Sequence, residues 1–186
     1  MLQSMTKNQK IVYIALLAAQ AVVIGLVERA IPFPFTFAPG AKLGLANLVT
    51  LLAIYTLPFK DSFMVVAIRL ILNTLLGGTL STFMIGFSGA LFSYFGMFLI
   101  KNLGGSKVST IGVSTAGGIL HNIGQLVAVS LLYHSWSFMV YLPIISFIGV
   151  FSGFAIGICA TFLMERIQLL RQFKMEQMTK QKELKS

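Results

Sequence analysis

The sequence has 186 residues, of which 56% are hydrophobic and only 10% are charged. A soluble domain carries roughly 25% charged residues, so the composition excludes an ordinary soluble protein and indicates a membrane protein with several spans. The formal net charge of +9 would suit a nucleic-acid-binding protein, but the basic residues lie beside apolar runs and in the tail, where membrane topology and anionic lipid account for them.

Six apolar runs are candidates for transmembrane helices, each of which needs about 20 mostly apolar residues. They cover residues 11–30, 43–59, 62–80, 83–100, 108–133 and 137–164. The second run is short, and the last two are long enough to tilt or break. We expect an all-α integral membrane protein with six transmembrane helices in residues 1–164, followed by a basic cytoplasmic helix or tail in residues 165–186.

The basic residues predict the orientation of these helices. With the N-terminus inside, Arg29 and Lys42 fall outside and Arg69 falls within a span. The cytoplasmic side then receives the other eleven of the fourteen Lys and Arg residues: Lys7, Lys10, Lys60, Lys101, Lys107, Arg166, Arg171, Lys174, Lys180, Lys182 and Lys185. This asymmetry follows the positive-inside rule, and an odd number of spans would break it. We therefore expect both termini in the cytoplasm.

In the first run, Ala15 and Ala19 form an A-x-x-x-A pair on one side of the expected helix. Small side chains four residues apart make a smooth surface that another helix can approach closely. The pair either packs inside the bundle or docks a second membrane protein.

The stretch FPFTFAPGAKLGLANLVT, residues 33–50, separates the first two runs and forms the largest expected outer loop. Phe35 and Phe37 alternate in a Pro-rich segment, so their rings lie on one side of an extended chain. They either anchor the loop at the membrane interface or cover an apolar ligand. Lys42 is placed to meet a negative group, and Asn47 follows it into the second run.

In the third run, Arg69 and Asn73 stand four residues apart and share a helix face. Charged side chains at membrane depth are costly and usually face protein or a cavity. Three roles remain open for Arg69: it binds an anionic ligand, pairs with Glu28 near the end of the first run, or extends to the cytoplasmic headgroups.

The fifth run carries LHNIGQL, in which His121 and Gln125 share a face while Asn122 lies about 100° away. These side chains either hydrogen-bond neighbouring helices or line a cavity, and we favour the cavity. Two His, one Cys and five acidic residues are too few for a convincing metal site, and we expect no cofactor.

Two further patterns concern packing and catalysis. Gly149, Gly153 and Gly157 form a G-x-x-x-G-x-x-x-G row that predicts close helix packing in the sixth run. The sequence holds no G-x-x-x-x-G-K-[ST] motif, and Asp61 is its only aspartate. A prenyl diphosphate synthase needs clustered aspartates to hold magnesium against a diphosphate. We therefore expect neither ATPase nor synthase activity from this chain.

Three segments carry a family resemblance: PGAKLGLANLVTLLAIY, RLILNTLLGG and HNIGQ. With them the chain resembles the Gx transporter family, often labelled heptaprenyl diphosphate synthase component I, from about Lys10 to Arg166. That family is similar to the substrate-binding S components of energy-coupling factor (ECF) transporters of bacterial cell membranes. The resemblance implies a six-helix S-component bundle, in which the loop after the first helix covers a substrate pocket open to the outside.

The resemblance also implies partners and site residues. Ala15 and Ala19 would contact the transmembrane coupling subunit, and two cytoplasmic ATPase subunits would drive transport. We expect Phe35, Phe37, Lys42, Asn47, His121, Asn122 and Gln125 to bind a small vitamin-like molecule or a quinone or isoprenoid precursor, with Arg69 and Asn73 as polar support. The alternative is a non-catalytic membrane subunit that docks a polyprenyl diphosphate synthase or a redox enzyme.

Overall fold

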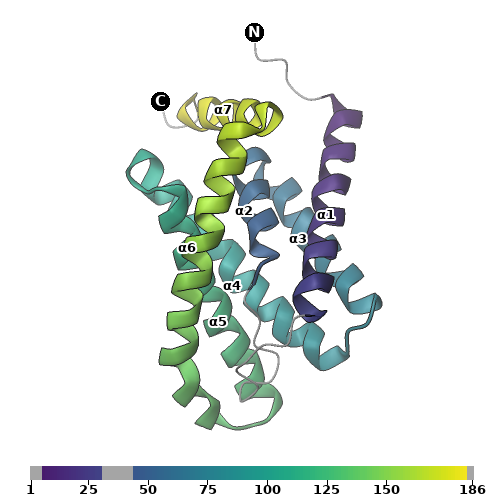
Figure 1. Cartoon of the computed structure of the whole chain (residues 1–186), viewed down its shortest axis with the longest axis vertical. Helices are drawn as coiled ribbons and strands as arrows, with labels where there is room; N and C mark the ends of the chain where they lie inside the picture. The colour runs from purple at the N-terminus through teal and green to yellow at the C-terminus, as the bar shows by residue number, and fades with distance from the viewer. Residues whose placement is uncertain (1–5, 31–43, 184–186) are drawn as a thin grey trace.

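The computed structural model describes residues 6–30 and 44–183, and α-helices dominate both ranges (Figure 1). No strand occurs in these two ranges. Two short 3-10 helices, η1 (Gly105–Lys107) and η2 (Trp136–Tyr141), lie between the longer elements. The seven α-helices are α1 (Lys7–Ala30), α2 (Asn47–Thr56), α3 (Phe59–Leu75), α4 (Leu80–Gly104), α5 (Thr110–Leu132), α6 (Leu142–Arg166) and α7 (Gln168–Glu183).

Four helical segments in the described ranges are long and apolar enough to cross a membrane: α1, α4, α5 and the segment Trp136–Arg166, which joins η2 to α6. The expectation of an all-helical fold is therefore confirmed for the described ranges, and four of the six expected spans are long and apolar enough to cross a membrane. The second expected span forms a helix of only ten residues, which is about 15 Å long at 1.5 Å per residue. The third forms a helix of 17 residues, α3.

The helices run back and forth along the longest axis of the molecule (Figure 1). We call the end that carries Lys7 and α7 the terminal end, and the end that carries Arg29 and η2 the loop end. Helix α6 runs from the loop end to the terminal end, where the chain becomes extended at Ile167 and turns into α7. Helix α7 lies across that end (Figure 1).

Glycines let α5 and α6 approach each other closely. A Cβ atom on Gly153 would lie 2.7 Å from the carbonyl oxygen of Ser114, and one on Gly157 would lie 2.7 Å from Cα of Ile111. A Cβ atom on Gly149 would lie 2.8 Å from the carbonyl oxygen of Gly118. The prediction of close packing by the glycine row of α6 is therefore confirmed.

Helix α2 lies at the centre of the bundle. It contacts α1, α3, α4, α5, α6 and α7, and nine of its ten residues are buried. Its last residue, Thr56, accepts a hydrogen bond of 2.9 Å from the hydroxyl of Tyr13 on α1. The high apolar content of α2 follows from this position, because a helix surrounded by other helices needs no polar face.

Helix α7 packs on the terminal end through Leu170 and Phe173, which are buried. The ring of Phe173 meets the ring of Tyr13 edge to face, with 5.0 Å between centroids. The ammonium groups of Lys101 and Lys174 lie 4.9 and 5.7 Å from the centroid of the Tyr55 ring. The basic tail thus forms a separate helix that packs against α2 and α6 at the terminal end and contacts α1 at Tyr13.

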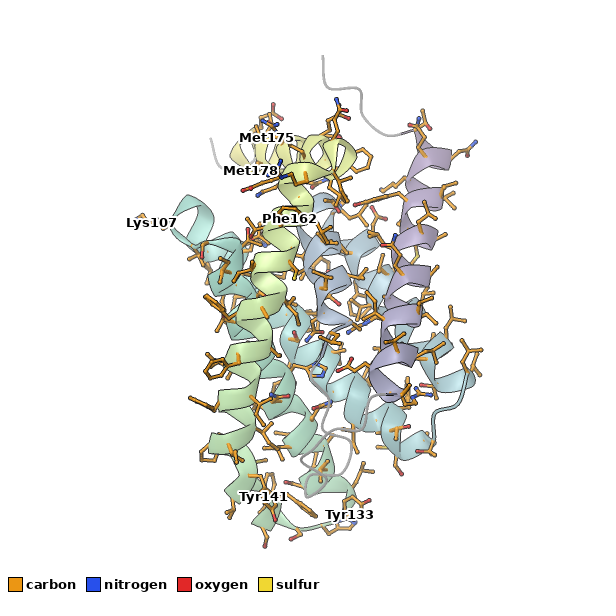
Figure 2. All side chains as sticks on the ribbon, in the orientation of Figure 1. Lys107, Tyr133, Tyr141, Phe162, Met175 and Met178 are labelled. Atoms are coloured by element: carbon orange, nitrogen blue, oxygen red, sulfur yellow. The ribbon has the colours of Figure 1, made fainter. Side chains whose placement is uncertain are left out.

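Apolar side chains also cover the outside of the bundle (Figure 2). Phe162 is labelled there and is 58% exposed, and Phe147 and Phe151 on the same helix are 64% and 61% exposed. So many exposed aromatic rings would favour aggregation in water, but they suit contact with lipid chains. Tyr133 and Tyr141 lie at the loop end, where aromatic side chains are typical of a membrane interface.

Candidate functional site

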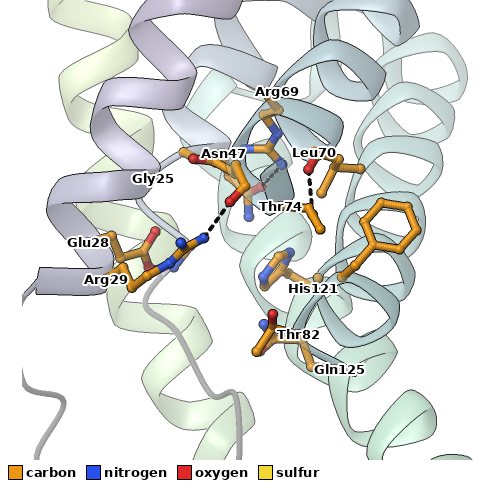
Figure 3. Close-up of a pocket in the computed structure, with 15 residues that line it drawn as sticks. Gly25, Glu28, Arg29, Asn47, Arg69, Leu70, Thr74, Thr82, His121 and Gln125 are labelled. Atoms are coloured by element: carbon orange, nitrogen blue, oxygen red, sulfur yellow. Dashed lines mark hydrogen bonds between the residues drawn. The ribbon is translucent and has the colours of Figure 1, made fainter. Parts of the chain in front are cut away.

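A pocket lies in the loop half of the bundle, between α1, α3, α4, α5 and the start of α2 (Figure 3). The volume of this cavity is about 70 Å³. Most of the side chains around it are polar. The lining residues are Gly25, Glu28, Arg29, Gly44, Ala46, Asn47, Arg69, Leu70, Asn73, Thr74, Thr82, Phe83, Gly86, His121 and Gln125.

Gly44 forms the turn that leads into α2 at the edge of this pocket. Its φ angle is +76°, a conformation that favours glycine. Its carbonyl accepts the backbone N–H of Asn47 at 2.8 Å, and its own N–H donates to the carboxylate of buried Glu28. A Cβ atom here would lie 3.0 Å from Nδ2 of Asn47 and 3.6 Å from Cδ2 of His121. The turn therefore brings α1, α2 and α5 together around one small backbone segment.

Arg69 on α3 reaches into the pocket beside Asn47, the first residue of α2 (Figure 3). Its side chain is 4% exposed, and its guanidinium donates to Oδ1 of Asn47 over 3.4 Å, which is long for a hydrogen bond. The Nε atom of Arg69 is buried without a hydrogen-bond partner. Arg69 thus lies beside the pocket and is not exposed towards lipid headgroups.

Arg29 and Asn73 join α1 to α3 at the pocket. The guanidinium of Arg29 donates to the backbone carbonyl of Asn73 over 2.8 Å. The side-chain oxygen of Asn73 is buried without a hydrogen-bond partner. Gly25 makes room for this amide, because a Cβ atom at Gly25 would lie 2.5 Å from Nδ2 of Asn73.

His121 and Gln125 reach the pocket from α5, one helical turn apart and both buried. Gly89 on α4 packs directly against them. A Cβ atom there would lie 2.8 Å from Cγ of Gln125 and 3.1 Å from Cε1 of His121. The small residue on α4 therefore lets α5 place both polar side chains in the pocket.

Asn122 does not line the pocket, because it lies on a different face of α5 from His121 and Gln125. It is buried, and its side-chain amide donates to the backbone carbonyl of Ile145 on α6 over 2.7 Å. It is absent from the pocket lining, so its contact belongs to the packing of α5 on α6.

The structure thus brings together five of the predicted side chains: Asn47, Arg69, Asn73, His121 and Gln125. Phe35, Phe37 and Lys42 lie outside the described residues. Sequence reasoning missed Arg29 and Thr82 as pocket residues. The sequence pattern relates Arg29 only to membrane topology, although a cation at the end of an apolar run can also line a pocket that opens at that end.

The chemistry of the pocket is suited to binding. Two guanidinium groups, one carboxylate, amides, hydroxyls and an imidazole line it, next to Leu70 and Phe83. Groups of three or more His, Cys, Asp and Glu side chains that could hold a metal ion do not occur in the described ranges.

Ala15 and Ala19 lie on a different surface, the outward face of α1, where both are exposed. Ile14 and Ala18 on the opposite face are buried in the bundle. The A-x-x-x-A pair therefore does not pack inside this chain.

In a comparison with protein families, a family model described as heptaprenyl diphosphate synthase component I matches residues 17–163. The matched region runs from the middle of α1 nearly to the end of α6 and leaves out α7. Comparison with curated proteins and with solved structures finds no significant match.

Proposed function

The chain belongs to the heptaprenyl diphosphate synthase component I family, and from that premise we propose that it is the substrate-binding component of an ECF-type importer. Component I is a non-catalytic, membrane-associated subunit, in agreement with the expectation that this chain is not an enzyme. The observation that carries the proposal is the polar pocket inside a bundle of apolar helices. Polar side chains at membrane depth are costly, and they mark the paths and sites of solutes.

The position of the pocket supports uptake from outside. Most basic residues lie towards the terminal end, which we place in the cytoplasm together with both termini. In this orientation the pocket lies in the outer half of the bundle. Residues 1–164, which hold α1 to α5 and all but the last two residues of α6, form the substrate-binding domain with six spans, and residues 165–186 form the cytoplasmic part that contains α7.

The outward face of α1 is the proposed contact with the transmembrane coupling subunit. Ala15 and Ala19 are exposed and small, so a partner helix can approach the backbone of α1 closely. Two ATPase subunits bound to the coupling subunit would supply the energy. In this assignment Asn47, Arg69, Asn73, His121 and Gln125 bind the substrate, while Phe35, Phe37 and Lys42 belong to the covering loop.

A copurification experiment tests this proposal. Tagged wild-type protein, expressed with a coupling subunit and ATPases of the same organism, should retain all three subunits in mild detergent. Ala15→Leu and Ala19→Leu should abolish the complex and substrate uptake, because a Leu side chain holds the partner helix away. Ala155→Leu, at an exposed position of α6, is the matched control and should keep both. A wild-type protein that retains no coupling subunit would refute the proposal.

The family name favours a second candidate, a membrane subunit that docks a polyprenyl diphosphate synthase. The family implies a partner, the synthase component II. The same copurification separates the two candidates, because this role predicts a soluble synthase in the eluate and no ATPase. Ala15→Leu would then have little effect on the complex, since the synthase would approach from the cytoplasm.

A further inference from the structure

Within the described ranges no ion pair in direct contact joins two charged groups of the pocket, although the carboxylate of Glu28 acts on Arg69 electrostatically. The pocket lining there holds Arg29 and Arg69 as cations and Glu28 as the acidic residue. The one ion pair found in the described ranges joins Lys10 to Asp61 and does not involve the pocket. Glu28 offsets one of the two positive charges, and the other has no counter-ion among the described lining residues. Because a buried charge without a counter-ion is unfavourable, the pocket has a place for one anion.

Two of the three charged groups already have partners. Glu28 accepts the backbone N–H of Gly44, and Arg29 donates to the carbonyl of Asn73. Arg69 has the weakest contacts of the three, with one hydrogen bond of 3.4 Å to Asn47 and a buried Nε atom that has no partner. Its side chain is 96% buried, since 4% is exposed, and it lines the pocket.

A guanidinium group with free donors is the usual partner of a carboxylate, which it binds through two parallel hydrogen bonds. The start of α2 adds a favourable potential, because the N-terminus of a helix carries a partial positive charge. Asn47, the first residue of α2, lies beside Arg69. The anion would thus sit between α3 and the start of α2, where the structure leaves donors unused.

We propose that the pocket binds a small monocarboxylate, whose negative charge pairs with Arg69 and whose apolar body lies against Leu70 and Phe83. Two guanidinium groups and one carboxylate leave one net positive charge among the described lining residues. One negative charge balances it, whereas a prenyl diphosphate would bring two or more. This inference names the substrate class of the proposed uptake protein and rests on that function, but it is tested on the isolated chain.

The test is thermal unfolding of the purified full-length protein in lipid nanodiscs. Benzoate, phenylacetate and hexanoate are the probes, their neutral amides are the matched controls, and inorganic pyrophosphate represents the diphosphate. At least one acid should raise the unfolding temperature in a concentration-dependent way, while its amide has no effect. Arg69→Gln should weaken the apparent Kd of that acid at least tenfold, and Arg171→Gln, at an exposed position of α7, should leave it unchanged.

Three results would overturn the inference: no acid of the series stabilises the protein, an amide stabilises it as strongly as its acid, or pyrophosphate stabilises it more. If Arg69→Gln does not fold, Arg69→Lys keeps the charge but loses the paired hydrogen bonds, and the comparison of acid with amide on the wild type still decides. Binding of a carboxylate without copurification of a coupling subunit would refute the proposed transport role alone. Copurification without carboxylate binding would refute this inference alone.

Discussion

Replacement of Gly153 by alanine tests whether close contact between α5 and α6 holds the bundle together. The new Cβ atom would lie 2.7 Å from the carbonyl oxygen of Ser114 and 2.8 Å from Cα of Thr115. Both are backbone atoms, so no side-chain rotation relieves the contact. Since ordinary van der Waals contact begins near 3.4 Å, the two helices must separate by about 0.7 Å here.

The cost follows from two opposing terms. Overpacking of a well-packed interface typically costs about 1–3 kcal/mol, and a backbone contact belongs at the upper end of that range. Alanine recovers about 1 kcal/mol through its higher helix propensity. We therefore expect Gly153→Ala to lower the free energy of unfolding by about 2 kcal/mol.

Gly86→Ala is the matched control on α4. The nearest atom to a Cβ there, Cδ2 of Leu70, lies 4.0 Å away, so only the gain in helix propensity of about 1 kcal/mol remains. The two variants should differ by about 3 kcal/mol, which corresponds to roughly 6–12 °C in unfolding temperature for a chain of this size. Both are heated in the same detergent, and the monodisperse fraction is measured by size-exclusion chromatography. Equal midpoints would refute the close-contact argument.

Two further predictions concern α7 and Asn122. Phe173→Ala removes a buried ring that contacts Tyr13, so it should weaken the docking of α7 by about 3 kcal/mol and speed tryptic cleavage within α7. Met178→Ala is the control, because this side chain is 40% exposed, and it should leave the rate of cleavage unchanged. Asn122→Ala removes the hydrogen bond to Ile145 and should cost about 0.6 kcal/mol in thermal unfolding, up to about 1.7. The Kd of a stabilising carboxylate should stay unchanged in this variant, and a tenfold loss would place Asn122 in the binding site.

The sequence predicts the positions of the first six helices well, because long apolar runs leave few alternatives to a helix in lipid. It predicts their lengths less well. Helix α2 covers ten residues of an expected run of 17, since the apolar pattern of residues 43–59 also includes the turn at Gly44 and the chain after Thr56. An apolar run predicts that the segment is buried, but it does not distinguish a buried turn from a buried helix.

The candidate site could be predicted in part for a similar reason. Polar residues at membrane depth are rare, so Arg69, His121 and Gln125 stand out, and all three line the pocket. Which side of α5 meets the pocket depends on where α6 packs, and this is set by the glycines of both helices. Asn122 therefore turned towards α6, although its neighbour in the sequence lines the pocket. Contacts such as that of Arg29 with Asn73 join separate helices and have no local pattern in the sequence.

The short length of α2 also bears on the distance that a solute would cover under the proposed function. Ten residues of helix separate Asn47 at the pocket from Thr56 at the terminal end, a rise of about 15 Å, whereas the hydrocarbon core of a bilayer is about 30 Å thick. If Thr56 marks one face of the hydrocarbon core, Asn47 lies near the midplane of the bilayer. Under the proposed function, a solute at Asn47 would then be separated from the terminal end by the length of α2 and by α7, which packs against α2 there.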